Sequence, residues 1–198
     1  LIITVQGPTG EEHTRLHRVT EQKSNLGIVA EANDLSRRIA QTELTPNEAL
    51  LEIDRLNRME SSYSPFEEFL AIAFICGFFA ILFQGDLHDF VASAITGSIG
   101  YMVFLYSKKI TNIRFFSELL GALTIGWVAF ILTNLSIGND INIIIVASIM
   151  TLVPGKAITN GIRDLMASHF ISGVSVLSDA LLTASAIGIG ISTVLSFI

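Results

Sequence analysis

The sequence predicts a mainly α-helical protein, a polytopic membrane bundle of five spans preceded by a small α+β cytoplasmic segment made of a β-hairpin and a helical hairpin. Three observations predict this class. Of the 198 residues, 51% are hydrophobic and only 15% are charged, against about 25% charged in a typical soluble domain. Nineteen of the thirty charged residues come before residue 69. Long apolar runs fill the remaining two thirds of the chain.

The polar first domain is expected to cover residues 1–62. Ile2 to Gln6 and His13 to Val19 alternate as short strands, and the Gly-Pro-Thr-Gly stretch at residues 7–10 is typical of the turn between them. The opening LIITV resembles a strand entered midway, so we expect that the natural start of the chain is missing. No signal-peptide pattern is present.

A helical hairpin is expected to complete this domain. Thr45 is a helix N-cap, Pro46 suits the first helical position, and Glu48 completes a capping box. Apolar residues recur at helical spacing on both sides of this start. The expected buried stripes are Ile28, Ala32, Leu35 and Ile39 on the first helix, and Ala49, Ile53 and Leu56 on the second.

The membrane domain is expected to cover residues 63–198. A helix that crosses a bilayer needs about 20 mostly apolar residues. The fourth run, Ile141 to Val153, is short, because thirteen residues rise only about 20 Å in a helix. The spans are expected at about residues 66–84, 88–106, 116–136, 140–153 and 174–197.

Basic residues predict the orientation of these spans, because Lys and Arg favour the cytoplasmic side. The junctions around residues 84–89 and 135–140 contain no Lys or Arg. The N-terminus is therefore expected in the cytoplasm and the C-terminus outside. The other two junctions contain all the basic residues of this domain: Lys108, Lys109, Arg114, Lys156 and Arg163.

The stretch LVPGKAITNGIRDLMASHF, residues 152–170, interrupts two apolar runs. Pro154 and Gly155 break the chain, since proline lacks a backbone donor and glycine tolerates unusual dihedral angles. An amphipathic helix is expected over residues 156–170, either lying in the cytoplasmic interface or forming part of a discontinuous helix that faces a water-filled cavity for an anionic group. Its polar residues are Lys156, Thr159, Asn160, Arg163 and Asp164.

Acidic residues at membrane depth are expensive unless they face water or a partner. Asp179 lies within an apolar run, about two turns beyond a bend expected at Gly173, so a functional role is favoured. Asp89 lies in the expected outer junction, where a solvated helix cap and a functional role are equally consistent with the sequence. Glu118 is expected to pair with Arg114 at i,i+4 spacing.

Several classes of function lack support in the sequence. It contains no G-x-S-x-G, Walker A, H-E-x-x-H or dinucleotide-binding turn, so we expect no catalytic residues, no cofactor and no metal. His13 and His17 match no specific ligand spacing, and Cys76 is the single cysteine. The acidic first domain disfavours binding to nucleic acid.

Two segments resemble the threonine/serine exporter family of bacterial membrane proteins. They are FQGDLHDFVASAITG at residues 83–97 and LVPGKAITNGIRDLMASHFISGVSVLSDALLTASAIGIG at residues 152–190. The order of a two-strand and helical-hairpin segment followed by five spans is also similar to the family, so the resemblance covers nearly the whole chain. In the family pattern a basic residue often stands at the position of Val176, and Glu at that of Asp179.

The resemblance implies a secondary transporter in the bacterial cytoplasmic (inner) membrane, one that exports threonine, serine or a dicarboxylate such as succinate, driven by the proton gradient. It implies the larger half of a split transporter, working with a second, smaller membrane subunit or another copy of itself. A membrane-anchored hydrolase-like or regulatory module and a non-transporting scaffold subunit are the alternatives. The expected substrate-binding or proton-coupling residues are Asp89, Pro154, Gly155, Lys156, Asn160, Arg163, Asp164 and Asp179.

Overall fold

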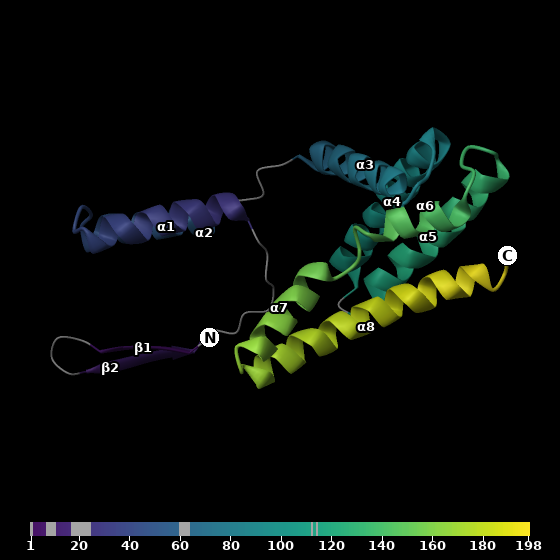
Figure 1. Cartoon of the computed structure of the whole chain (residues 1–198). Helices are drawn as coiled ribbons and strands as arrows, with labels where there is room; N and C mark the ends of the chain where they lie inside the picture. The colour runs from purple at the N-terminus through teal and green to yellow at the C-terminus, as the bar shows by residue number, and fades with distance from the viewer. Residues whose placement is uncertain (1, 7–10, 17–24, 60–63, 112, 114) are drawn as a thin grey trace. The chain divides into compact units, whose positions relative to one another are not determined.

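The computed structural model describes residues 2–6, 11–16, 25–59, 64–111, 113 and 115–198. The chain divides into two compact units, Leu1–Ser62 and Tyr63–Ile198. In the first unit, β1 (Ile2–Gln6) pairs antiparallel with β2 (Glu12–Leu16), with Ile2 opposite Leu16 (Figure 1). The end expected for the second strand, at Val19, lies outside the described residues.

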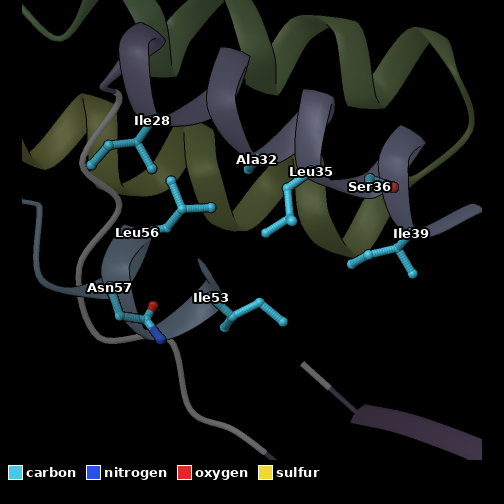
Figure 2. Close-up of a pocket in the computed structure, with 8 residues that line it drawn as sticks. All are labelled: Ile28, Ala32, Leu35, Ser36, Ile39, Ile53, Leu56 and Asn57. Carbon is cyan, nitrogen blue, oxygen red and sulfur yellow. The ribbon is translucent and has the colours of Figure 1, made fainter. Parts of the chain in front are cut away.

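The same unit contains a helical hairpin of α1 (Leu26–Ala40) and α2 (Pro46–Asn57). The predicted capping box is confirmed: the Thr45 amide donates to Glu48 Oε2 at 2.8 Å, and the Glu48 amide donates to Thr45 Oγ1. Figure 2 shows apolar side chains of both helices lining a shared pocket. Among the side chains of the two predicted stripes, only Leu35 and Ala49 are buried, because two helices alone cover little surface.

Where it is described, the second unit has helices as its regular secondary structure, joined by turns and loops. A three-residue turn separates the last two, so the predicted amphipathic helix ends earlier than residue 170 and the final helix begins earlier than residue 174. The helices are α3 (Pro65–Leu82), α4 (Leu87–Ile110), α5 (Phe116–Asn134), α6 (Ile141–Ile149), α7 (Gly155–Met166) and α8 (Phe170–Leu195).

Three of these helices, α4, α5 and α8, are long and apolar enough to cross a membrane, judged over the described residues. They correspond to the second, third and fifth expected spans. The first expected span corresponds to α3, which has 18 residues. The fourth corresponds to α6, whose nine residues rise only about 14 Å as a helix, so its helix alone does not span a bilayer.

Small residues bring α3, α4 and α6 together. A Cβ atom on Gly97 of α4 would overlap Cys76 Sγ of α3 and would lie 3.5 Å from the Ser148 Cα of α6. The small-residue spacing at Ser93 and Gly97 therefore serves packing within one chain. Beside this contact, α4, α5 and α6 enclose a core formed by Ala92, Ala129, Leu132, Ile144 and Ile145.

The alignment of α5 with α8 shows how far α8 extends beyond the start of α5. A Cβ atom on Gly190 would lie 2.8 Å from Ala122 Cβ, and one on Gly126 would lie 2.9 Å from Val194 Cβ. These two contacts make the helices run in the same direction, with the start of α5 level with about residue 184 of α8. At 1.5 Å per residue, the first part of α8 extends about 20 Å beyond the start of α5. There α8 packs against α7 (Figure 1).

Candidate functional site

The expected site residues fall into two polar clusters at opposite ends of the second unit. The first cluster joins the start of α4 to the loop between α5 and α6. The second runs along the helical hairpin formed by α7 and α8. We call them the loop clamp, formed by Asp86, Asp89, Asn139 and Asp140, and the hairpin stripe, formed by Lys156, Asn160, Asp164, Ser172 and Asp179.

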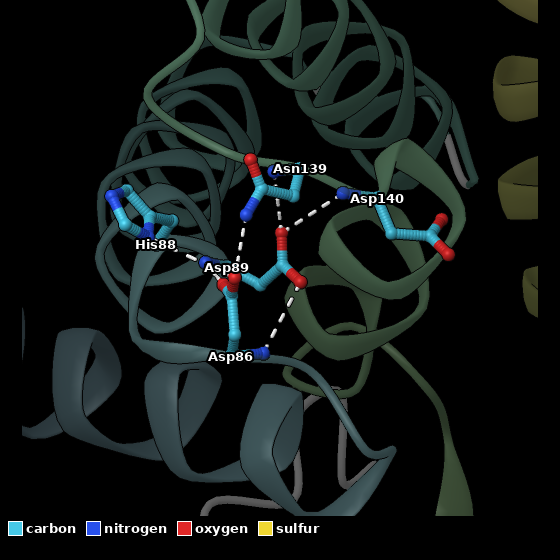
Figure 3. A network of polar contacts seen from close by, with 5 residues as sticks. All are labelled: Asp86, His88, Asp89, Asn139 and Asp140. Carbon is cyan, nitrogen blue, oxygen red and sulfur yellow. Dashed lines mark hydrogen bonds and ion pairs between the residues drawn. The ribbon is translucent and has the colours of Figure 1, made fainter.

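Asp89 is the centre of the loop clamp and is only 3% exposed. Its Oδ1 accepts hydrogen bonds from the backbone amides of Asn139, at 2.8 Å, and Asp140, at 3.0 Å. Its Oδ2 accepts from the Asp86 amide at 3.3 Å (Figure 3). Three backbone amides thus converge on one carboxylate. This favours the helix-cap interpretation of Asp89, and the contacts add no support for proton coupling or ammonium binding.

Asp86 completes the clamp as the N-cap of α4. Its Oδ1 accepts from the Asp89 amide at 2.9 Å, and its Oδ2 accepts from Asn139 Nδ2 (Figure 3). His88 Nδ1 lies 3.7 Å from the same Oδ2. The bond from the Asp89 amide, with smaller contributions from Asn139 and His88, lowers the pKa of Asp86 and outweighs the opposing effect of burial.

The hairpin has its turn at residues 167–169, where Ser168 adopts φ 63° and the His169 amide donates to the Asp164 carbonyl at 2.8 Å. The bend expected at Gly173 was therefore wrong, because Gly173 lies inside α8. A Cβ atom on Gly173 would lie 3.0 Å from the Gly161 carbonyl oxygen. Glycine is needed here for the close approach of two helices, a use that the sequence does not distinguish from a bend.

The break between α6 and α7 is present as expected. Pro154 is the N-cap residue of α7, without a side-chain cap bond, and the Gly155 amide donates to the Val153 carbonyl at 2.8 Å. Apart from its chain neighbours and the nearby backbone of α7, no heavy atom of the described residues lies within 4 Å of the position of a Gly155 Cβ. The segment before the break belongs to the bundle, because Leu152 packs with Ala122, Ile125 and Ile187.

The structure places the remaining expected residues along the hairpin. Lys156 and Arg163 are exposed on α7, and Asn160 is half-buried. Asp164 is half-buried and accepts a hydrogen bond from Ser172 Oγ at 2.6 Å. Asp179 is half-buried on α8. The two helices therefore hold six of the eight expected residues, counting Gly155 at the start of α7. Pro154 directly precedes them, and Asp89 lies in the other cluster.

Apolar side chains cover much of the rest of the hairpin surface. Met166 on α7 is 83% exposed and Ile171 on α8 is 91% exposed. Ile162, Val174, Leu181 and Leu182 are exposed as well. A surface of this kind suits lipid or another membrane segment, and the polar stripe is an exception within it.

Sequence reasoning missed two kinds of contact. Ser172 was not singled out, although its position eight residues after Asp164, across a short turn, was a weak local signal. Asn139 and Asp140 follow Asp89 by about fifty residues, and no sequence pattern connects them.

The expected pair of Glu118 and Arg114 involves a residue outside the described part of the chain, because Arg114 is not described. His17 also lies outside the described residues. In the part of the chain that the structure describes, no group of three His, Cys, Asp or Glu side chains could hold a metal.

The long apolar helices and the packed helical unit define a membrane protein. The chain matches the family model ThrE, described as "Putative threonine/serine exporter", over residues 1–198. It therefore belongs to the threonine/serine exporter family, and the resemblance seen in the sequence is confirmed. Comparison with curated proteins and comparison with solved structures each found no match.

Proposed function

We propose that this chain is one half of a secondary transporter that exports small polar metabolites, threonine and serine or a dicarboxylate such as succinate, using the proton gradient. It would work with a second, smaller membrane subunit or with another copy of itself. The observation that carries the proposal is the hairpin stripe beside the break at Pro154. Its charged side chains lie among exposed apolar ones, and charged residues retained in apolar surroundings at a membrane commonly bind substrates or ions.

The proposal includes five crossings with the N-terminus in the cytoplasm and the C-terminus outside. The fourth crossing would consist of α6 and the segment that follows it. In support, Leu152 is level with Gly121 and Ala122 near the start of α5, while Ile144 packs near its end with Ala129 and Leu132. The hairpin then extends from the end of the bundle where α3 and α5 begin and α4 ends with Lys108 and Lys109, which the basic residues assign to the cytoplasm.

A hairpin stripe at the cytoplasmic end suits an exporter, because an exporter must take its substrate from that side. Lys156, Asn160 and Arg163 would contact the substrate carboxylate, helped by the first amides of α7, whose N-cap residue makes no side-chain cap bond. Asp179 would contact the ammonium group or carry the coupled proton. Asp164 would hold the hairpin through Ser172.

Efflux from living cells tests this function. Bacteria lacking their own exporters would be loaded with a threonine dipeptide or with succinate, and would express this chain alone or with a candidate smaller subunit. We expect release above background that collapses with a protonophore. Asp179→Asn should abolish it, while Asp140→Asn, which makes the same change of charge at the other end, should not, because Asn caps helices about as well as Asp.

Two results would contradict the proposal. If the chain is in the membrane and neither substrate is released with or without the smaller subunit, the chain would be a membrane-anchored module or would act on another substrate. If the smaller subunit exports at the full rate without this chain, this chain would be a scaffold.

A further inference from the structure

The helical hairpin of α1 and α2 has two different faces. One face holds an open groove whose lining contains no charged side chain (Figure 2). The opposite face is lined by five charged side chains of both signs, and there Arg55 pairs with Glu52 at 3.3 Å. The groove face therefore has the character of half a protein core, and the charged face that of an ordinary surface. The apolar residues of the groove are Ile28, Ala32, Leu35, Ile39, Ile53 and Leu56.

The two helices leave this groove uncovered. Ile39 and Ile53 are 40% and 41% exposed, and Ala32 is exposed as well. Among the described residues of α1 and α2, only Leu35 and Ala49 are buried. Short helices gain most of their stability from packing of an apolar face, so the groove face needs a further layer against it.

The charges of the hairpin favour a protein layer over a lipid surface. Residues 25–59 contain four Arg and six Asp or Glu, whereas helices that lie on anionic lipid carry mainly Lys and Arg on their polar face. At the border of the groove, Arg37 is the residue after Ser36 on α1, and Asp54 is the residue after Ile53 on α2. Each charge lies about 100° further around its helix than the groove residue before it. The two borders of the groove therefore carry opposite charges.

We propose that the groove face pairs with the same face of a second copy of the chain, so that two hairpins form a four-helix bundle. A twofold axis parallel to the helices sets α1 of each copy against α2 of the other, and all neighbouring helices are then antiparallel. The pairing buries no charge from the groove. The inference goes beyond the proposed function, because it does not depend on which molecule is transported.

The borders of the groove fit this arrangement. It brings Arg37 of each copy to the side of the bundle where Asp54 of the other copy lies. Arg58 follows Asp54 by four residues and lies about 6 Å further from the turn between the helices, while Arg37 is near that turn. The nearer charge for Arg37 is therefore the opposite one.

Crosslinking through one introduced cysteine tests this pairing in the full chain. Ala32 lines the groove, Ala30 lines the charged face, and both are exposed. The twofold axis keeps each residue level with its own copy, so the two Ala32 positions meet inside the bundle. With a short bifunctional maleimide in membranes, most of Ala32→Cys should become covalent dimer. Ala30→Cys should stay at the wild-type background, which is set by the single native cysteine, the buried Cys76.

A charge placed in the groove tests the pairing without a crosslinking reagent. Ala32→Glu puts two carboxylates inside the bundle, so the dissociation constant of the dimer should rise by about tenfold or more. Ala30→Glu makes the same change on the charged face and should alter that constant by less than about twofold. Analytical ultracentrifugation in detergent would measure both. Because Ala32 is exposed in the single hairpin, the variant should fold, and circular dichroism would check its helix content.

Three results would overturn the pairing. Equal crosslinking of Ala30→Cys and Ala32→Cys would show random collision of the chains. A chain that stays monomeric, with Ala32→Cys uncrosslinked, would show that no second copy covers the groove. Crosslinking of Ala32→Cys to a co-expressed smaller subunit would make that subunit the occupant. None of these measurements uses efflux, so the pairing and the proposed function can fail separately.

Discussion

The two ends of the helical unit contain similar residues in different surroundings. At one end, the loop clamp has aspartates and no Lys or Arg, and its central carboxylate is buried beneath backbone amides. At the other end, the hairpin stripe places Asp164 and Asp179 on partly exposed helices together with Lys156. Both ends contain an aspartate that the sequence marks as a candidate for function.

The difference shows how burial and backbone contacts identify a structural carboxylate. Asp89 accepts hydrogen bonds from three backbone amides, which satisfy most of its acceptor capacity and anchor the loop before α6. A carboxylate held in this way is poorly placed to bind a substrate ammonium. Asp179 is only half-buried, and it takes part in an interaction of its own, so the two carboxylates differ chiefly in burial. The following predictions test this contrast.

The largest effect is expected for Asp89→Ala. Three amides lose their acceptor at a buried position, so the free energy of unfolding should fall by about 3 kcal/mol. Thermal unfolding in detergent would show a lower melting temperature. Asp89→Asn keeps one carbonyl oxygen and should cost less. A melting temperature unchanged by Asp89→Ala, with transport lost, would assign Asp89 to transport instead of to the clamp.

The close approach in the hairpin predicts the next effect. In Gly173→Ala, the new Cβ would lie 2.7 Å from Leu165 Cδ2 and 3.0 Å from the Gly161 carbonyl, so the helices must separate, at about 2 kcal/mol. Gly188→Ala on the same helix is the control, because a Cβ atom there would meet no heavy atom of the described residues within 4 Å, apart from its own stretch of α8. It should gain up to about 1 kcal/mol of helix propensity. Equal melting temperatures for the two variants would contradict this packing.

A smaller effect is expected for Ser172→Ala. The variant removes the donor to Asp164, a hydrogen bond of 2.6 Å on a partly exposed surface, and should cost about 1 kcal/mol. A double-mutant cycle with Asp164→Ala measures the pair itself, and the coupling should account for most of that loss. A coupling of zero would show that the bond does not hold the hairpin.

The smallest effect is expected on the stability of the protein at acid pH. The folded state lowers the pKa of Asp86 below its ordinary value of 3.8, chiefly through the Asp89 amide. The stabilisation by Asp86 is therefore present above pH 3.8 and is lost as the pH falls through the lower folded value. Melting temperatures measured between pH 5 and pH 3, reported as the difference from Asp86→Asn, should converge at the acid end. A difference that stays constant would contradict the clamp role of Asp86.

Local features of the sequence determined much of the fold. The apolar runs located the helical unit, and the Thr45 capping box determined the start of α2, because caps and hydrophobic runs act over a few neighbouring residues. The segment at residues 152–190 also showed the family, which the match over the whole chain confirms. The break at Pro154 was predictable for the same reason, since proline and glycine act on their own backbone.

Only the tertiary structure decided the roles of the polar residues within that fold. Asp89 became a clamp because amides about fifty residues away meet its carboxylate, and Gly173 became a contact because α7 folds back onto α8. The register of that hairpin, set where Gly161 meets Gly173 and Asp164 meets Ser172, brings Lys156 and Asp179 to about the same level. Such roles depend on which surfaces meet in space, and the spacing of residues along a single chain does not specify the packing of two helices.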